Sequence, residues 1–335
     1  MNKRLTLCIG ACTMALTLQS FAAEDFDVPR NAFGHPDLQG IWTNATQTPL
    51  VRPAELGEKR FLTQDEAEAR EQRAVQSAIR ADNPSDPDRA PPTDGNTAAA
   101  YNSFWLDRGT RVAHIDGEYR TSLIIDPPDG QIPLRADAPA TLREQWTSQP
   151  GTGPFDGPEL LSIGDRCLIF WDFRTSSSSA GPPMVPLMYN NNYQIVQTPD
   201  YVMILVEMMS DVRIIRLNDE PLPDAMYRWM GDSVGRWDGD TLVVTTTNMH
   251  PQQSHFGSTA QLTVTEHFTR VAQDKIVYRV TMDDPSAYTQ PWTAEIPMHV
   301  RPAGDRIYEY ACHEGNYALR GILAGARAEE NQQQD

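Results

Sequence analysis

Glu266, Glu309 and His313 are the side chains of this chain best suited to proton transfer. Strand alternation places Glu266 on the apolar face of a predicted strand 262–270. It also puts Glu309 and His313 on one face of a predicted strand 306–314. A carboxylate on an apolar face is unfavourable unless it is paired, and a barrel interior can acquire a working acid in this way. His313 would serve as general acid or base, because imidazole titrates near neutral pH.

Each of these residues also has a structural interpretation. Glu266 or Glu309 could form an ion pair with Arg213 or Arg279, because structural pairs also fill such positions. His313 could be a hydrogen-bonded residue at the end of a barrel. In the catalytic interpretation, Arg213 would hold an oxyanion, and Glu309 or Glu266 would orient His313 or serve as its partner.

Cys312 stands next to His313, but the pair is not predicted to act as a nucleophile. Adjacent strand residues point to opposite faces, so the two side chains cannot readily touch. Only Cys167 and Cys312 remain once the N-terminal segment is removed. In an oxidising compartment they are expected to form one disulfide, the alternative being two buried free thiols.

His250 and His255 flank a Pro-Gln-Gln-Ser loop. A metal site needs a third ligand, which this stretch does not supply, so neither a metal nor another cofactor is predicted. Recognition of a polar ligand at a barrel mouth is the preferred interpretation. The stretch Gly231–Gly235 matches Gly-x-Ser-x-Gly by letter, but a nucleophile elbow needs a following helix, and a turn and strand follow instead. The candidate ligand-binding residues are Glu207, Tyr193, His250, His255 and Trp292.

Short runs rich in Val, Ile, Thr, Tyr and Trp alternate with tight turns from Tyr193 to Glu314. This pattern predicts an antiparallel meander, and hence a mainly β protein. A meander of this length is expected to close into a barrel, with a β-sandwich as the alternative, because closure removes exposed edges. The predicted strands are 193–198, 201–208, 212–217, 241–247, 262–270, 276–282, 292–300 and 306–314.

The N-terminus has the composition of an export signal, with Lys3 and Arg4 before an apolar run and small residues near Ala22. A lipidated Cys12 is the alternative. The run is too short for a membrane span. The formal net charge of −17 disfavours nucleic acid and anionic lipid as partners. A periplasmic or secreted protein is expected.

The chain divides by composition into four parts. Residues 1–23 are the predicted signal peptide, and 24–117 are an N-terminal extension. The extension contains a surface helix, Gln64–Ile79, preceded by a capping box at Thr63, and then a linker rich in Pro and Asp. Residues 118–327 are the predicted β domain. Its stretch 135–190 is rich in Pro, Gly and Ser and should contain a long loop. A disordered tail, 328–335, is expected to follow.

Several motifs resemble those of a large family of uncharacterised secreted bacterial proteins. They are GDSVGRWDGDTLVV at 231–244, TTTN at 245–248, PWTAE at 291–295 and YEYACHEGNY at 308–317. Members often carry His where this chain has Ser210. The predicted meander also looks like the calycin or lipocalin-like barrels. That likeness implies a small ligand held in a cavity, although fold does not fix function.

The sequence thus predicts a secreted β-barrel that binds a small organic molecule in its cavity. A sugar derivative, an aromatic compound or a terpenoid would suit the Trp, Tyr and Met content. Metal-independent acid–base turnover, as a lyase, isomerase or hydrolase, is the enzymatic form of this hypothesis. A periplasmic module that binds a glycan or a protein without catalysis is the rival. The oligomeric state is left open.

Overall fold

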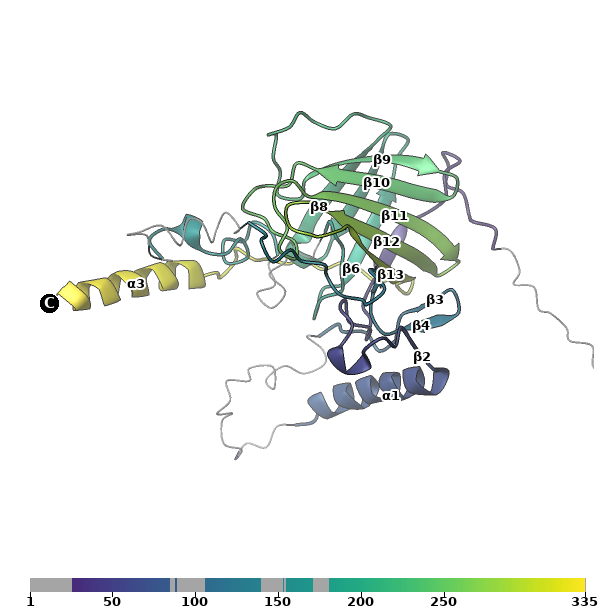
Figure 1. Cartoon of the computed structure of the whole chain (residues 1–335), viewed down its shortest axis with the longest axis horizontal. Coiled ribbons are helices and arrows are strands. Elements are labelled where there is room, and N and C mark those ends of the chain that lie inside the picture. Colours follow the sequence, from purple (N-terminus) through teal and green to yellow (C-terminus); the bar gives the residue numbers. More distant parts are fainter. Residues whose placement is uncertain are drawn as a thin grey trace, which may run out of the picture.

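The computed structural model describes residues 26–84, 88, 106–139, 153, 155–170 and 181–334. These residues form a closed barrel of nine strands (Figure 1). The prediction of a mainly β barrel is confirmed. The predicted signal peptide, Cys12, and most of the linker after α1 lie outside the described residues.

Eight of the nine strands come from the C-terminal half of the chain. The ninth, β1, closes the barrel by pairing with β6 on one side and β13 on the other. The strands are β1 (Gly40–Thr43), β6 (Asn192–Gln197), β7 (Tyr201–Val206), β8 (Asp211–Leu217), β9 (Asp232–Asp238), β10 (Thr241–Thr247), β11 (Thr263–Ala272), β12 (Lys275–Asp283) and β13 (Trp292–Val300).

One neighbouring pair in the barrel, β8 and β9, is parallel, and the other neighbours are antiparallel. The sequence predicted an antiparallel meander throughout, which is wrong at this pair. An odd number of strands cannot close with every neighbour antiparallel, because directions that alternate around the ring would clash at the last pair. Residues 218–231 cross from the end of β8 back to the start of β9 at the opposite end of the barrel, so these two strands run parallel.

The predicted N-terminal extension is partly built into the barrel, since β1 belongs to it. β5 (Ile124–Asp126) pairs with the start of β13. It lies on the same edge of β13 that pairs with β1 near the end of that strand. A small sheet of β2 (Phe61–Leu62), β3 (His114–Ile115) and β4 (Glu118–Arg120) lies beside the barrel. The predicted surface helix is confirmed as α1 (Gln64–Ala81), with the capping box at Thr63 present. Short 3-10 turns occur at η1 (Ala54–Leu56), η4 (Pro158–Leu160) and η5 (Met208–Ser210).

Alternation along the strands fills the barrel with side chains. On β11, Val264, Glu266 and Phe268 are all buried, as the sequence predicted. On β12, Ile276, Tyr278, Val280 and Met282 are fully buried. The interior is therefore a packed core, in which Trp42, Trp292, Tyr193, Tyr278 and Phe268 are among the largest buried side chains.

The two ends of the barrel differ. The loop end is where β6, β8, β11 and β13 begin, and the far end is where these strands finish. Long connections gather at the loop end, on the left of the barrel in Figure 1. At the far end, the Arg270 guanidinium donates to the carbonyls of Asp37 and Gln273 and lies over the Trp42 ring. The far end is thereby sealed by buried polar contacts.

The segment predicted as a last strand, Arg306–Glu314, forms no strand. Residues 301–317 instead lead from the end of β13, at the far end, to the loop end and into α3 (Ala318–Gln334), where the sequence predicted a disordered tail after 327. The predicted disulfide between Cys167 and Cys312 is present. It ties this C-terminal segment to residues 155–170, which carry η4.

Gly235 lies in the parallel pair of β8 and β9, opposite Leu217. A Cβ atom there would lie 2.7 Å from Cγ2 of Ile215 on β8 and 3.2 Å from Cδ2 of Leu217. We expect Gly235→Val to lower the free energy of unfolding by about 1–3 kcal/mol, because overpacking forces side chains and strands apart. Urea unfolding would measure this. Val234→Thr, on the partly exposed face of the same strand, is the control and should change stability by less than about 1 kcal/mol.

Candidate functional site

An ion pair lies inside the barrel near the loop end. The guanidinium of Arg213 on β8 donates from Nη1 to Oε1 of Glu266, at 2.9 Å, and from Nη2 to Oε2, at 2.6 Å. The side chains are 1% and 0% exposed. This two-pronged geometry suits a guanidinium and a carboxylate, and it compensates part of the large desolvation penalty of two buried ions. Of the structural alternatives, the pairing of Glu266 with Arg213 is therefore the one present.

Neighbouring strands surround the ion pair with polar groups. The Tyr278 hydroxyl on β12 donates to Oε1 of Glu266 at 2.8 Å. Ser233 and Thr246, on β9 and β10, lie 3.3 and 3.5 Å from Nη2 of Arg213 and 2.8 Å from each other. Burial and the nearby Glu266 carboxylate raise the pKa of Tyr278 well above its ordinary value, so this hydroxyl stays a donor. We call these five residues the inner polar cluster.

A strap, residues 181–185, covers the inner polar cluster from the loop end. All five strap residues are buried. The backbone N–H of Met184 donates to the Tyr278 hydroxyl at 3.1 Å, and a Cβ on Gly181 would lie 3.6 Å from Cδ of Arg213. Nε of Arg213 has no hydrogen-bond partner in the described part of the chain. The cluster thus keeps one buried donor, Nε of Arg213, without a partner among the described residues beneath the strap.

Tyr193 and Asn44 extend the polar groups toward β1 and β6. Nδ2 of Asn44 donates to the Met184 carbonyl at 3.0 Å and to the Tyr193 hydroxyl at 3.3 Å. Burial raises the pKa of Tyr193, and the hydrogen bond from Asn44 and the positive charge of Arg213 oppose this only in part. Tyr193, predicted as a ligand-binding residue, therefore lies within the electrostatic reach of the inner polar cluster.

Glu207, another predicted ligand-binding residue, lies in the turn between β7 and β8. Its Oε2 accepts from Asn192 at 2.6 Å, and the residue is 5% exposed. The turn is strained, since Met209 and Ser210 both have positive φ. The next residue, Asp211, has a carboxylate oxygen without a partner in the described residues. Burial raises the pKa of Asp211 to about 6.

The other three predicted ligand-binding residues also lie at the loop end. His255 and Trp292 are fully buried, and the Nε2 atoms of His255 and Gln253 lie 2.8 Å apart. His250 is partly exposed and stacks on Trp229, with ring centroids 3.9 Å apart. Burial, with a smaller effect of Arg166, lowers the pKa of His250. The five predicted ligand-binding residues therefore all lie at the loop end of the barrel. They come from the starts of β6 and β13 and from the β7–β8 and β10–β11 connections.

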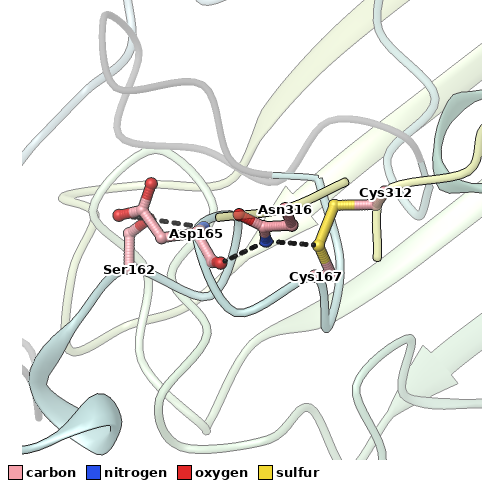
Figure 2. The surroundings of a disulfide bond; sticks show 5 residues. All are labelled: Ser162, Asp165, Cys167, Cys312 and Asn316. Carbon is pink, nitrogen blue, oxygen red and sulfur yellow. Dashed lines mark hydrogen bonds between the residues drawn. A yellow bond between two sulfur atoms is a disulfide. The ribbon is translucent and has the colours of Figure 1, made fainter. Parts of the chain in front are cut away.

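The predicted catalytic set is not assembled. Glu266 and Arg213 are buried inside the barrel, whereas Glu309 and His313 are exposed on the C-terminal segment. The sequence also led us to expect that Glu266, Glu309 and His313 would line one cavity, and that expectation is wrong. It rested on alternation in a strand that does not form. Figure 2 shows how the disulfide fixes this segment: Asn316 donates to the Asp165 carbonyl and to Sγ of Cys167, each at 3.3 Å.

Sequence reasoning named Arg213 and Glu266 but missed Tyr278, Asn44 and the strap. Tyr278 was detectable, because it occupies an inward position between Ile276 and Val280. Asn44 contacts Met184, 140 positions further on, and Met184 contacts Tyr278, 94 positions further on. No local spacing of residues indicates either contact. The contacts that join them to the site are long-range.

Across the described ranges, no three His, Cys, Asp or Glu side chains are grouped as a metal site would require. None of the helices in those ranges is long and apolar enough to cross a membrane. Surface grooves of about 510 and 480 Å³ run along α1 and α3, outside the barrel.

Comparison with protein families, with curated proteins and with solved structures gave no match. The resemblance to secreted bacterial proteins therefore stays a prediction. The closed barrel agrees with the calycin-like architecture that the sequence suggested.

The ion pair gives a stability prediction. Glu266→Leu should lower the free energy of unfolding by about 3–5 kcal/mol, because it leaves the Arg213 charge buried and unpaired. The double variant Arg213→Met with Glu266→Leu should recover most of that loss, since well-packed apolar residues of similar volume often replace a buried ion pair without penalty. Urea unfolding of the three proteins measures both. A double variant as unstable as the single one would contradict the assignment.

Asp211 gives a pH prediction. Its folded pKa of about 6 lies above the ordinary value of about 3.9 in an unfolded chain. Between these values the folded protein keeps a proton that the unfolded chain has lost, so this group makes stability fall as pH rises through the window. Asp211→Asn should therefore melt above the parent beyond about pH 6 and match it below about pH 4. Circular dichroism melts across this range measure the difference, and a constant offset would contradict the prediction.

Proposed function

We propose that this protein binds a small organic molecule at the loop end of its barrel, with the inner polar cluster as the group that fixes the ligand's orientation. The observation that carries the proposal is the Arg213–Glu266 pair, which is fully buried in the barrel interior. Such a pair is weak evidence for stability, because apolar residues of similar volume often serve as well. Ligand sites, by contrast, are mostly apolar with a few well-placed polar groups.

The ligand would have an apolar, flat body and one hydrogen-bond acceptor. Nε of Arg213 is the donor available to that acceptor. Met184, Met208 and Met249 belong to the buried core, and all three lie on loop-end connections. Methionine is unbranched and repacks readily, so these side chains could make room for the ligand without moving strands. The aromatic class is favoured among the predicted ligands, because Tyr193 and Trp292 lie at the same end.

Binding is favoured over catalysis. A general acid or base must come within hydrogen-bond reach of its substrate. His313 and Glu309, the proposed proton-transfer pair, are exposed on the C-terminal segment, while Arg213 is enclosed. The proposed function therefore includes no acid–base step.

Export to the periplasm or to the medium is part of the proposal. The disulfide between Cys167 and Cys312 supports it, because such bonds persist in oxidising compartments. The apolar N-terminal stretch after Lys3 and Arg4 has the composition of an export signal.

Anilinonaphthalene sulfonate, an aromatic anion whose fluorescence rises in apolar sites, is a suitable first probe. The parent protein should give a saturable rise in fluorescence. The double variant Arg213→Met with Glu266→Leu should bind at least about tenfold more weakly, the effect of losing about 1.4 kcal/mol of interaction.

The control variant neutralises an ion pair at the far end, Arg30→Gln with Asp240→Asn, where both partners are about half exposed. It should bind the probe like the parent. Near-ultraviolet circular dichroism checks that each variant keeps its packed core. Equal binding by the inner-pair variant, or no saturable binding by the parent, would make the ion pair purely structural.

A further inference from the structure

Residues 305–311 have the sequence of a strand but no sheet. The segment, which we call the arm, reads Asp-Arg-Ile-Tyr-Glu-Tyr-Ala, and Ile and Tyr favour strands. No bend, turn or helix interrupts it, and none of its residues has a positive φ. The N–H groups of Tyr308 and Tyr310 both face the barrel rim, as in an extended chain, and the chain turns only after that, where the N–H of Cys312 donates to the Tyr310 carbonyl at 3.0 Å. In Figure 1 it belongs to the yellow trace that leads to α3. A strand-forming segment is thus held in strand-like shape without a neighbouring strand.

One edge of the arm is bound to the barrel rim by side chains. The N–H of Tyr308 donates to Oε1 of Glu207 at 3.5 Å, and the N–H of Tyr310 donates to Oγ of Ser210 at 2.8 Å. The arm is fixed at both ends, because Arg301 donates to the Ile41 carbonyl at 2.8 Å and Cys312 is in the disulfide. Tyr308 and Tyr310 are two residues apart, and N–H groups at this spacing point to the same edge of a strand.

The other edge is open. Backbone groups alternate between the two edges of an extended chain, so the N–H groups of Ile307, Glu309 and Ala311 point away from the rim. None of the three has a hydrogen-bond partner in the described residues. Native proteins usually protect such an edge with proline, lysine or a bulge. The arm contains neither proline nor lysine.

We propose that the open edge of the arm binds an extended segment of a basic polypeptide, which adds as a strand. Main-chain hydrogen bonds supply the affinity in this mode, and side chains on alternate positions supply the specificity. The partner is basic, because the chain carries a formal charge of −17 and the exposed Glu309 lies at the centre of the edge. Tyr308, 74% exposed, offers an aromatic surface to the partner's side chains.

The probe is a fluorescein-labelled synthetic peptide, Lys-Thr-Val-Lys-Val-Thr-Lys, titrated with the full chain at low salt and followed by fluorescence anisotropy. A second peptide of the same sequence carries N-methyl groups on all its inner residues, which blocks both hydrogen-bonding edges. The first peptide should bind with saturation. The methylated peptide should bind at least about fivefold more weakly, since it loses several hydrogen bonds, each with a net contribution of about 1 kcal/mol.

A matched pair of variants tests the same edge from the protein side. Glu309→Pro removes the outward N–H of residue 309 and leaves the N–H groups of Tyr308 and Tyr310, which hold the arm, in place. Glu309→Ala keeps the outward N–H and removes only the charge. The alanine variant should bind the peptide with a modest loss, and the proline variant should bind at least about fivefold more weakly than the alanine variant, since it also loses a hydrogen bond.

Two results would overturn the proposal. The first is absence of saturable binding, or equal binding of the plain and methylated peptides, which would mean that water alone covers the edge. The second is concentration-dependent dimerisation of the chain in analytical ultracentrifugation, with no peptide binding and with loss of the dimer in Glu309→Pro. In that case the occupant is a second copy of the arm. The methylated peptide keeps the test valid if the proline variant fails to fold.

Discussion

Closure of the barrel by β1 is the constraint on which the rest of this structure depends. Four residues, Gly40–Thr43, satisfy backbone groups of both β6 and β13, so neither strand is left with an exposed edge between them. Trp42, fully buried, anchors β1 in the core. With β1 in place the strand count is odd, which requires one parallel pair and therefore the long crossover between β8 and β9.

The crossover and the other long connections determine what the loop end contains. Gly181–Val185 passes over the inner polar cluster, and its backbone completes the hydrogen bonding of Tyr278. A buried ion pair is tolerated here because Tyr278, Ser233 and Thr246 supply further hydrogen bonds to it. In the proposed function, the methionines above this packed interior are the side chains that would repack to make room for a ligand.

The C-terminal segment reaches the same end on the outside of the barrel. It is held by the disulfide and by side chains of the strained β7–β8 turn, so its position depends on the geometry of that turn. Unlike β1, it does not enter a sheet. The arm and the inner polar cluster are therefore two separate candidate sites, one for a polypeptide and one for a small molecule, at one end of the barrel.

The sequence by itself determined the local features: strand alternation on β11 and β12, the capped helix α1, the pairing of the two cysteines, and the burial of Glu266. These follow from short-range periodicity and from composition. Only the tertiary structure decided that β1 closes the barrel, that β8 and β9 run parallel, and that Arg213 rather than Arg279 pairs with Glu266. It also decided that 306–314 stays outside the sheet, because β1 and β5 already occupy the free edge of β13. Competition for a strand edge is a long-range property, which no local pattern of residues records.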